Sequence, residues 1–455
     1  MNRHFSALVV GGGISGLVCA YALRKAGIDA QLVEASPRPG GVINSVTCDG
    51  FLLELGPQSF SSTPALCELC VDLGISKELL QAPPHAPRYV LIDGELRPVP
   101  LSPPAFFTSS LINGSTKWAL LRDIFGKSVP PDGDESVADF VRRKFSPQLL
   151  DRLVGPFVSG IYAGDPERLS VRSAFPQLYE AEKAAGSIVR GMLRLAKFKK
   201  RPRERPTLQS FREGNETLVH ALANELGPSL LTETSVTAIS RQIDGSFDIR
   251  LVSHGANESV STRCLILATP TDVTGRLLSP LDSSFETLLS SIEYAAVAVV
   301  SLGYRKNDVG HSLNGFGFLV PRSASLRVLG TVWNSSLFHG RAREGHSLIT
   351  SFVGGTTDAA AATLEPQELA NLVHREISTL LSTRSQPVFS NVTIWPHALP
   401  QYNLGHGERL AAVAEVCSRF PGLWLTGNYL QGPAIGSCVD QALAVAEEVR
   451  KHLAT

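Results

Sequence analysis

Residues 7–34 read ALVVGGGISGLVCAYALRKAGIDAQLVE and predict a strand, a glycine turn, a helix and a second strand. The apolar run at 7–10 is typical of a strand that is buried on both faces. Gly11, Gly13 and Gly16 follow it as G-x-G-x-x-G. In that order they permit a sharp turn, a close approach of a pyrophosphate to the backbone, and tight packing of the helix on the strand.

The helix expected over about 14–25 would direct its free N–H groups and its positive dipole end at that phosphate. The second strand, at 30–33, ends at Glu34, where a carboxylate can accept hydrogen bonds from a ribose. An isolated glycine motif is weak evidence, because glycine is common in turns. Here every part of the unit occurs in order, so a dinucleotide site is favoured over a structural turn.

A second glycine pair follows the acidic residue, in Arg38-Pro39-Gly40-Gly41. The order G-x-G-x-x-G, Glu, R-x-G-G resembles the opening of the FAD-binding flavoproteins of the amine oxidase and phytoene desaturase group. Dehydrogenases that use only a nicotinamide do not usually carry this second pair. An ordinary surface loop is the alternative interpretation of 38–41.

Composition is that of a globular protein with two or three domains: 455 residues, 43% hydrophobic and 18% charged. Lysine plus arginine equals aspartate plus glutamate, at 42 each, so no overall field favours nucleic acid. The seven cysteines are irregularly spaced and no secretory signal precedes the first strand, which predicts a reducing, cytoplasmic location. Cys67 and Cys70 have zinc-like spacing but lie in a predicted amphipathic helix, so core packing is favoured.

Residues 42–55 predict a strand pair that turns at Asp49-Gly50. The next four residues, Gly56 to Ser59, resemble the flavoprotein segment that runs beside the isoalloxazine ring, and a tight turn is the alternative. A hairpin is expected within 83–104, with strands at 88–92 and 95–99 and a turn at Asp93-Gly94. From 104 to about 200 strand signals largely disappear, which indicates an inserted helical region.

The stretch 190–205 holds eight basic residues and one glutamate. A solvated helix end that runs into a linker is one interpretation. The other is an anionic membrane surface, because Met192, Leu193, Leu195 and Phe198 alternate with the charges. No apolar run is long enough to span a bilayer, and the longest, at 295–302, suits a buried strand.

Residues 207–272 return to strands and a helix, and LILATP at 265–270 resembles the strand that re-enters a cofactor domain. Residues 273–419 predict a second sheet with helices. The segment 422–438 predicts a strand, a glycine-rich turn and the entry to a closing helix at about 437–452. The N-terminus of that helix could face the pyrimidine end of a flavin.

Seven phrases along the chain resemble the FAD-dependent protoporphyrinogen oxidases: GGGISGL, FLLELGPQSF, PFVSGIYAGDPERLS, GFGFLVP, TSFVGG, PQYNLGH and GNYLQGPAIGSC. PFVSGIYAGDP and PQYNLGH are specific to that family. The resemblance implies an α/β fold, α+β overall, in three domains. These are a Rossmann-type FAD-binding domain at 1–82, 206–272 and 420–455, a mixed-sheet substrate-binding domain at 83–104 and 273–419, and a helical, membrane-facing insert at 105–205.

The resemblance also implies site residues. Arg88 would pair with a substrate propionate, Leu319 and Val332 would hold one face of the tetrapyrrole, Phe352 would stack on a pyrrole ring, and Gly160 would leave room near the flavin. Val332 is smaller than the leucine expected there, while Pro433 and Ala442 also depart from the family pattern. The expected FAD contacts are Gly11, Gly12, Gly13, Ile14, Ser15, Gly16, Glu34, Ala35, Arg38, Gly40, Gly41, Val42, Gly56, Pro57, Gln58, Ser59, Val236, Asn428, Pro433, Ala434 and Ile435.

The implied reaction is oxidation of protoporphyrinogen IX to protoporphyrin IX in haem biosynthesis, with O2 as acceptor and H2O2 as product. Coproporphyrinogen III is the alternative substrate. Amine or carotenoid oxidation shares the N-terminal fingerprint but does not need Arg88, and a non-catalytic flavin-binding protein is the alternative class. Besides the porphyrinogen and oxygen, the expected partners are the cytoplasmic face of a membrane, a ferrochelatase, or a second copy in a homodimer. No catalytic residue beyond FAD, no metal and no nucleic acid is expected.

Overall fold

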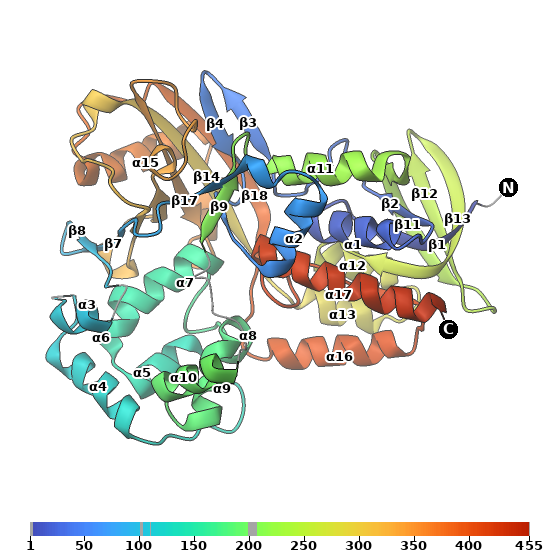
Figure 1. Cartoon of the computed structure of the whole chain (residues 1–455), viewed down its shortest axis with the longest axis horizontal. Helices are drawn as coiled ribbons and strands as arrows, with labels where there is room; N and C mark the ends of the chain where they lie inside the picture. The colour runs from blue at the N-terminus through green and yellow to red at the C-terminus, as the bar shows by residue number, and fades with distance from the viewer. Residues whose placement is uncertain (1–2, 101–102, 110, 199–206, 455) are drawn as a thin grey trace.

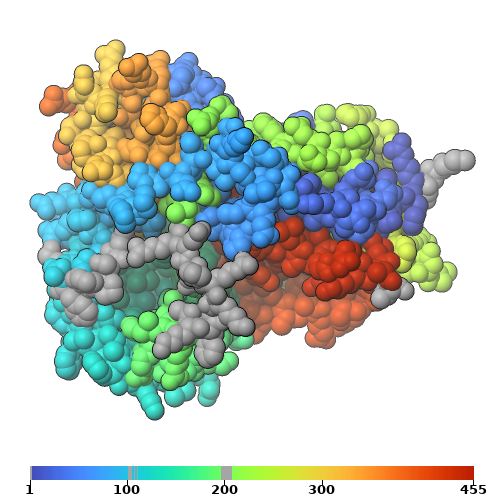
Figure 2. Space-filling model, viewed as in Figure 1, coloured from blue at the N-terminus to red at the C-terminus, as the bar shows by residue number. Residues whose placement is uncertain are grey.

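A computed structural model describes residues 3–100, 103–109, 111–198 and 207–454. Three regions are visible (Figure 1): a sheet with helices α1, α11 and α17, a second sheet with α15, and a group of helices from α3 to α10. The space-filling view shows the helical group, cyan to green, below the yellow and orange second sheet (Figure 2).

The first sheet has the strand order β10-β2-β1-β13-β12-β11, and β19 pairs with β13. Parallel pairing joins β10, β2, β1 and β13, whereas β13, β12 and β11 are antiparallel. The strands are β1 (Arg3–Val10), β2 (Ala30–Val33), β10 (Leu230–Leu231), β11 (Thr234–Arg241), β12 (Phe247–Ser253), β13 (Ala256–Leu267) and β19 (Leu423–Leu425). The predicted strand, turn, helix and strand at 7–34 are therefore confirmed, with α1 spanning Ile14–Lys25.

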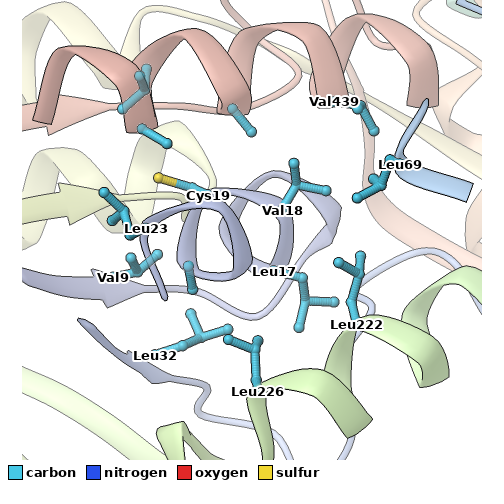
Figure 3. Packing of buried hydrophobic residues seen from close by; sticks show 14 of the residues in the cluster. Val9, Leu17, Val18, Cys19, Leu23, Leu32, Leu69, Leu222, Leu226 and Val439 are labelled. Carbon is cyan, nitrogen blue, oxygen red and sulfur yellow. The ribbon is translucent and has the colours of Figure 1, made fainter. Parts of the chain in front are cut away.

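Side chains of β1 alternate between two hydrophobic clusters, as the period of a strand requires. Ala7 and Val9 lie with α1, α11 (Glu216–Leu226) and α17 (Ile435–Ala454). Figure 3 shows Val18 and Cys19 of α1 turned toward α17, and Leu17 toward Leu222 of α11. Cys70 of α2 (Pro64–Asp72) joins the same cluster, but Cys67 is exposed, so the predicted core packing holds only for Cys70.

The opposite face of β1, through Leu8 and Val10, packs on residues of three further helices. These are α12 (Thr271–Leu278), α13 (Ser284–Ser290) and α16 (His406–Ser418). All three fall mostly or wholly within 273–419, which the sequence assigns to the substrate-binding domain. The core of the first sheet thus crosses the predicted boundary, because these amphipathic helices bury their apolar faces on the first sheet rather than on the second.

The second sheet has the order β18-β14-β17-β16-β15-β7-β8 and is antiparallel except for the β15–β7 pair. Helix α15 (Pro366–Leu381) covers one face, on which Leu369 and Val373 pack against Ala298 and Val300. The strands are β7 (Arg88–Ile92), β8 (Glu95–Pro98), β14 (Tyr294–Arg305), β15 (Gly317–Leu319), β16 (Val328–Val332), β17 (His346–Gly354) and β18 (Phe389–Pro400). The predicted hairpin at 88–99 corresponds to β7–β8.

Short strands lie between the two sheets. The hairpin β3 (Ser45–Cys48) and β4 (Phe51–Glu54) turns at the predicted Asp49-Gly50, and Phe51 stacks on Phe389 of β18 with ring centroids 5.0 Å apart. A small sheet joins β5 (Phe60–Ser61), β9 (Leu208–Phe211) and β6 (Leu79–Gln81). Single turns complete the list: α14 (Asn334–Leu337) and 3-10 turns at Ser76–Glu78, Gly227–Ser229, Lys306–Asp308, Arg322–Ala324 and Ala359–Thr363.

The inserted region is helical, as its sequence predicts. It contains α3 (Pro103–Thr108), α4 (Gly114–Phe125), α5 (Val137–Lys144), α6 (Pro147–Leu149), a π-turn (Leu150–Val154), α7 (Gly155–Tyr162), α8 (Val171–Ala174), α9 (Pro176–Ala185) and α10 (Ile188–Phe198). Side chains of Asn113, Ser136 and Ser170 cap α4, α5 and α8. Buried Lys144 pairs with Asp123 at 2.6 Å, and Asp123 also accepts hydrogen bonds from the first amides of α10.

Candidate active site

The glycine turn leaves an open helix N-terminus at the carboxyl edge of the first sheet. Gly13 precedes α1, and no side chain caps the first amides of that helix. A Cβ on Gly13 would have no protein atom within 4 Å, whereas a Cβ on Gly16 would lie 1.9 Å from the Gly11 carbonyl oxygen. Gly16 therefore serves helix packing, and the space above Gly13 suits a phosphate.

The second glycine pair lies directly on this turn. The Gly40 amide donates to the Gly12 carbonyl at 2.7 Å, and Gly13 and Gly40 form a bridge. Arg38 donates to the carbonyls of Ile43 and Gly41 at 2.9 and 2.7 Å, and contacts the Glu216 carboxylate at 3.1 Å. Arg38 was expected to contact FAD, but these nitrogens hold the loop in shape. The alternative interpretation of this segment was an ordinary surface loop. These hydrogen bonds to the glycine turn do not fit that interpretation.

Glu34 lies where a ribose is expected. One carboxylate oxygen accepts from the Gly12 amide at 2.6 Å and the other from the Ser36 amide at 2.8 Å. The start of β11 lies beside it, because the Thr234 amide donates to the Glu34 carbonyl at 2.9 Å. Val236, which the family resemblance assigns to the adenine side of FAD, lies two residues further along β11.

Close backbone packing and side-chain hydrogen bonds hold the Gly56–Ser59 segment in place. A Cβ on Gly56 would lie 2.0 Å from the Val42 carbonyl oxygen, so these two predicted FAD contacts are neighbours. The Gln58 side-chain amide donates to the Glu54 and Gly56 carbonyls at 2.8 and 2.9 Å, and its oxygen accepts from Asn334 at 2.6 Å. Gln58 thus fixes this segment with its side chain, and only its backbone is left to face a ligand.

A buried ion pair lies under this segment. The Arg341 guanidinium is 3.1 Å from the Glu54 carboxylate, which also accepts from the Asn215 amide at 2.9 Å. Burial raises the pKa of Glu54 to about 7, against the opposing effect of the Arg341 cation. The Asn215 side chain donates to the Pro57 carbonyl at 2.7 Å. Sequence analysis did not identify Arg341, Asn215 or Asn334 as parts of this site.

The C-terminal segment reaches the same edge. Helix α17 begins at Ile435, two residues before the predicted start, and Ile435 is buried in the cluster that contains α1. The Ser15 side chain contacts Cys438, so the first turns of α1 and α17 are adjacent. The residues predicted to contact FAD therefore lie along one edge, with Glu34 and Val236 at one end and Gly56–Ser59 and Asn428–Ile435 further along.

The predicted substrate residues share one face of the second sheet. Gly317 is the register partner of both Arg88 and Val332, and Gly330 is the partner of both Leu319 and Phe352. Side chains of partner residues point to the same face, and so do those of residues two apart. This face is opposite the one that α15 covers, because Phe318 and Val353, which alternate with them, pack into the α15 cluster.

Helix α7 packs on this face. A Cβ on Gly160 would lie 2.5 Å from Leu319 Cδ2, so the absence of a side chain at Gly160 allows the close approach. Phe157 and Ile161, on the same helix, are each 42% exposed. The face and the helix together form a largely apolar surface, which suits a flat hydrophobic ligand.

Arg88 lies at the edge of this surface. Its guanidinium lies over the Phe316 ring, 5.5 Å from the centroid. Among the residues that the structure describes, no carboxylate forms an ion pair with it, and partial desolvation lowers the pKa of this side chain. A guanidinium with free N–H donors beside an apolar face is suited to bind a carboxylate of an otherwise apolar ligand.

Other titratable groups take no part in this surface. Burial lowers the pKa of His406 to about 4, so this ring is neutral, and His397 is exposed next to Asp272. Within the described ranges, no three histidine, cysteine or acidic side chains are grouped so as to hold a metal ion.

A dinucleotide cradle with a second glycine pair, next to an apolar face on a second sheet, defines a flavin-dependent oxidoreductase. The chain belongs to the family described as flavin containing amine oxidoreductase, which matches residues 14–450. Open space at Gly13, the uncapped N-terminus of α1 and the Glu34 carboxylate fit the pyrophosphate and ribose of FAD, which is the cofactor of this family.

Three similar proteins illustrate the relationship. "Protoporphyrinogen oxidase, chloroplastic" of Oryza sativa subsp. japonica is 35% identical over 474 residues, covering 98% of this chain and 88% of the relative. "Coproporphyrinogen III oxidase" of Bacillus subtilis is 29% identical and covers 98% of each chain. A crystal structure of a "putative protoporphyrinogen oxidase" from Exiguobacterium sp. 255-15 aligns over the full length of both chains, with a TM-score of 0.81 and 25% identity.

Proposed function

We propose that this protein oxidises protoporphyrinogen IX to protoporphyrin IX in haem biosynthesis, with molecular oxygen as the acceptor and H2O2 as the product. The observation that supports this most directly is Arg88, a guanidinium at the edge of an apolar face that forms no ion pair with any residue the structure describes. The names of the similar proteins agree with a porphyrinogen, and the relative at 35% identity favours the protoporphyrinogen over the coproporphyrinogen.

In this proposal the bound FAD would supply the electron transfer between the porphyrinogen and oxygen. The protein binds and orients the substrate. Arg88 holds a propionate, Leu319 and Val332 lie against one side of the tetrapyrrole, and Phe352 stacks on a pyrrole ring. Gly160 leaves the space that a side chain would fill. Burial of this face excludes water around the reacting carbon.

Anaerobic mixing tests the proposal. Purified holoprotein is mixed in stopped flow with protoporphyrinogen IX, with coproporphyrinogen III, and with a primary amine, while the absorbance of oxidised flavin is followed. Rapid loss of flavin absorbance with protoporphyrinogen IX, and return of absorbance with H2O2 formation when air is admitted, are expected. Faster reduction by coproporphyrinogen III would assign that substrate instead. Reduction by the amine alone, or by none of the three, would contradict the proposal.

We also propose that the insert contacts an anionic membrane surface. Four large apolar side chains of this region are strongly exposed: Trp118 (67%), Phe125 (80%), Val129 (86%) and Leu193 (61%). Trp118 and Phe125 lie two turns apart on one face of α4, and α10, which carries Leu193, packs against α4. Basic residues of 190–205 would add attraction to anionic lipid, although residues 199–205 and the side chain of Phe198 lie outside the part that the structure describes.

Flotation with vesicles of phosphatidylglycerol and phosphatidylcholine tests this contact. Binding at low salt that weakens as salt rises is expected. The variant Trp118→Ser/Phe125→Ser should lose most of the binding. Ile243→Ser, which changes an equally exposed apolar residue in the turn between β11 and β12, should retain it. Equal binding of both variants would contradict the role of the insert. Within the described residues, no helix is both long and apolar enough to cross a bilayer.

The remaining partner assignments stay predictions. These are a ferrochelatase contact, a homodimer, and the cytoplasmic location that the irregularly spaced cysteines predict.

A further inference from the structure

Two phrases that are specific to the family meet in the structure. Residues 400–406 (PQYNLGH) lie against residues 156–166 (PFVSGIYAGDP). The Gln401 side-chain amide donates to the Tyr162 carbonyl at 2.8 Å, and a Cβ on Gly164 would lie 2.6 Å from the Gln401 side-chain oxygen. The Tyr162 and Tyr402 rings are 5.7 Å apart. The 400–406 segment is therefore attached to the end of α7 in the helical insert.

The backbone of this segment strengthens the attachment. The Ser170 amide donates to the Tyr402 carbonyl at 2.8 Å, and the Leu404 amide donates to the Arg168 carbonyl at the same distance. The Gly405 amide donates to the Asp134 carboxylate at 2.9 Å. Three separate parts of the insert thus bind one short segment that lies between β18 and α16.

The side chains of the same segment bind a different part of the protein. The Tyr402 hydroxyl donates to the Asn428 carbonyl, and His406 Nε2 lies 2.9 Å from the Tyr429 carbonyl. The two rings stack with centroids 4.4 Å apart and planes at 10°, and both side chains are almost fully buried. Since the His406 ring is neutral and a carbonyl can only accept, Nε2 carries the proton.

Asn428 and Tyr429 open the loop that leads into α17, here named the flavin loop (residues 427–435). Gly427 and Gly432 in this loop have φ values of +154° and +137°, a backbone region that glycine adopts far more readily than other residues. Because glycine can adopt many backbone dihedral angles, such a loop can change its conformation unless other groups hold it. Two hydrogen bonds to consecutive carbonyls, from a buried stacked pair, remove this freedom.

We propose that Tyr402 and His406 are positioning residues that fix the flavin loop and connect it to the helical insert. The inference rests on the predicted contact of Asn428 and Pro433–Ile435 with FAD, and it does not depend on which substrate is oxidised. Residues 400–406 (PQYNLGH) belong neither to the substrate face nor to the dinucleotide site, and this proposal gives them a structural role.

Reconstitution of the apoprotein with FAD tests the proposal without any porphyrinogen. Tyr402→Phe removes one hydroxyl and leaves the Asn428 carbonyl without its donor. We expect about a tenfold rise in the dissociation constant of FAD, together with a shift of the bound-flavin absorption spectrum. The matched control is Tyr304→Phe, since this buried hydroxyl lies 2.9 Å from His374 Nδ1 in the second-sheet core. Tyr304→Phe should lower the melting temperature but leave FAD affinity and spectrum unchanged.

Gln401→Leu tests the connection to the insert, because the Gln401 side-chain amide donates to the Tyr162 and Leu399 carbonyls rather than to a carbonyl of the flavin loop. A weaker FAD affinity in this variant, beyond that of Tyr304→Phe, is expected if the insert helps to hold the loop. Unchanged FAD affinity and spectrum in Tyr402→Phe would overturn the positioning role. An effect in Tyr402→Phe without one in Gln401→Leu would overturn the connection to the insert. Failure to oxidise porphyrinogens would leave these binding results intact, so the two proposals fail separately.

Discussion

Arg341 and Glu54 form an ion pair whose closest atoms, Nη2 and Oε1, are 3.1 Å apart, with side chains only 1% and 2% exposed. Arg341 follows α14 in the substrate half of the chain, and Glu54 ends β4, next to the Gly56–Ser59 segment. The pair therefore connects the loop after α14 to the β3–β4 hairpin, next to the segment that is expected to lie beside the flavin ring. The Gln58 side chain, which donates to the Glu54 carbonyl at 2.8 Å, extends the connection to the segment itself.

Removing one member of this pair should be costly. Arg341→Met leaves the Glu54 carboxylate buried without its cation, and we expect a loss of about 3–5 kcal/mol in the free energy of unfolding. Arg341→Met/Glu54→Gln should recover part of it, because the glutamine oxygen can still accept from the Asn215 amide. Urea unfolding of the apoprotein measures both. Arg450→Met, which breaks an exposed pair with Glu447, is the control and should cost less than about 1 kcal/mol. Equal losses in the single and double variants would contradict the argument.

Two glycines of the same motif should respond differently to alanine. At Gly16 a Cβ would lie 1.9 Å from the Gly11 carbonyl oxygen, so Gly16→Ala should lower apoprotein stability by about 1–3 kcal/mol or more. At Gly13 the new Cβ would meet no protein atom, and φ of −67° suits alanine. Gly13→Ala should therefore leave the apoprotein melting temperature nearly unchanged and weaken FAD binding at least about tenfold, because the Cβ occupies the phosphate space. Calorimetry and FAD titration separate the two effects. Similar apoprotein melting temperatures for both variants would contradict this assignment.

Local patterns predicted much of the fold. The 7–34 unit, the β7–β8 hairpin and the helical insert follow from apolar runs, glycine positions and short-range periodicity, which depend on neighbouring residues. The packing of α12, α13 and α16 on the first sheet was not predicted from the sequence. Their amphipathic patterns indicate a buried face but not which sheet covers it.

The candidate site likewise contains some residues that could be predicted from the sequence and others that could not. Gly11–Gly16 and Glu34 could be found because all parts of the dinucleotide motif lie within one short stretch. Asn334 could not, because it binds Gln58, which lies 276 positions away in the chain. The same applies to Arg341, whose partner Glu54 lies far away in the chain, at the end of β4. A single asparagine or arginine in a sequence carries no signal of a distant buried partner, and only the folded structure brings them together.

His406 should make stability depend on pH. In an unfolded chain a histidine titrates near 6.5. Burial lowers the pKa of His406 in the folded protein to about 4, with Arg409 acting in the same direction and the Tyr429 carbonyl, Asp134 and Glu408 opposing it. Between these two values the unfolded chain binds more protons, so the stabilisation is complete above about pH 6.5 and is lost as pH falls toward 4.

The expected loss from this group is about 2 kcal/mol between pH 7.5 and pH 5. His406→Gln, whose side-chain amide can still donate to the Tyr429 carbonyl, should lack this contribution. Urea unfolding of both proteins at the two pH values measures the difference. If the free energy of unfolding changes equally with pH in the wild type and the variant, the buried His406 ring does not contribute to the pH dependence of stability.

Arg88 separates the proposed reaction from its rivals. Its guanidinium can bind both oxygens of a propionate through two parallel N–H donors. Replacement by alanine removes a charge-assisted hydrogen bond of roughly 1.5–3 kcal/mol, so kcat/KM for the porphyrinogen should fall about ten- to a hundredfold. Arg88→Lys should recover only part of the activity, because it keeps the charge but not the paired donors. FAD content and melting temperature should change little in both variants, since the Arg88 side chain is exposed.

The matched control is Arg305→Ala, which removes an exposed arginine at the end of β14 in the same sheet, six residues along the strand from Val299, the register partner of Phe352. This variant should keep wild-type kinetics. Steady-state oxidation of protoporphyrinogen IX and coproporphyrinogen III, with FAD content measured on each sample, distinguishes the outcomes. Wild-type turnover of both substrates by Arg88→Ala would show that the propionate binds elsewhere. Loss of activity only in proportion to lost FAD would show that Arg88 supports the fold rather than the substrate. A kcat/KM that falls at full FAD content, and is partly restored by lysine, is the result that a carboxylate-binding arginine requires.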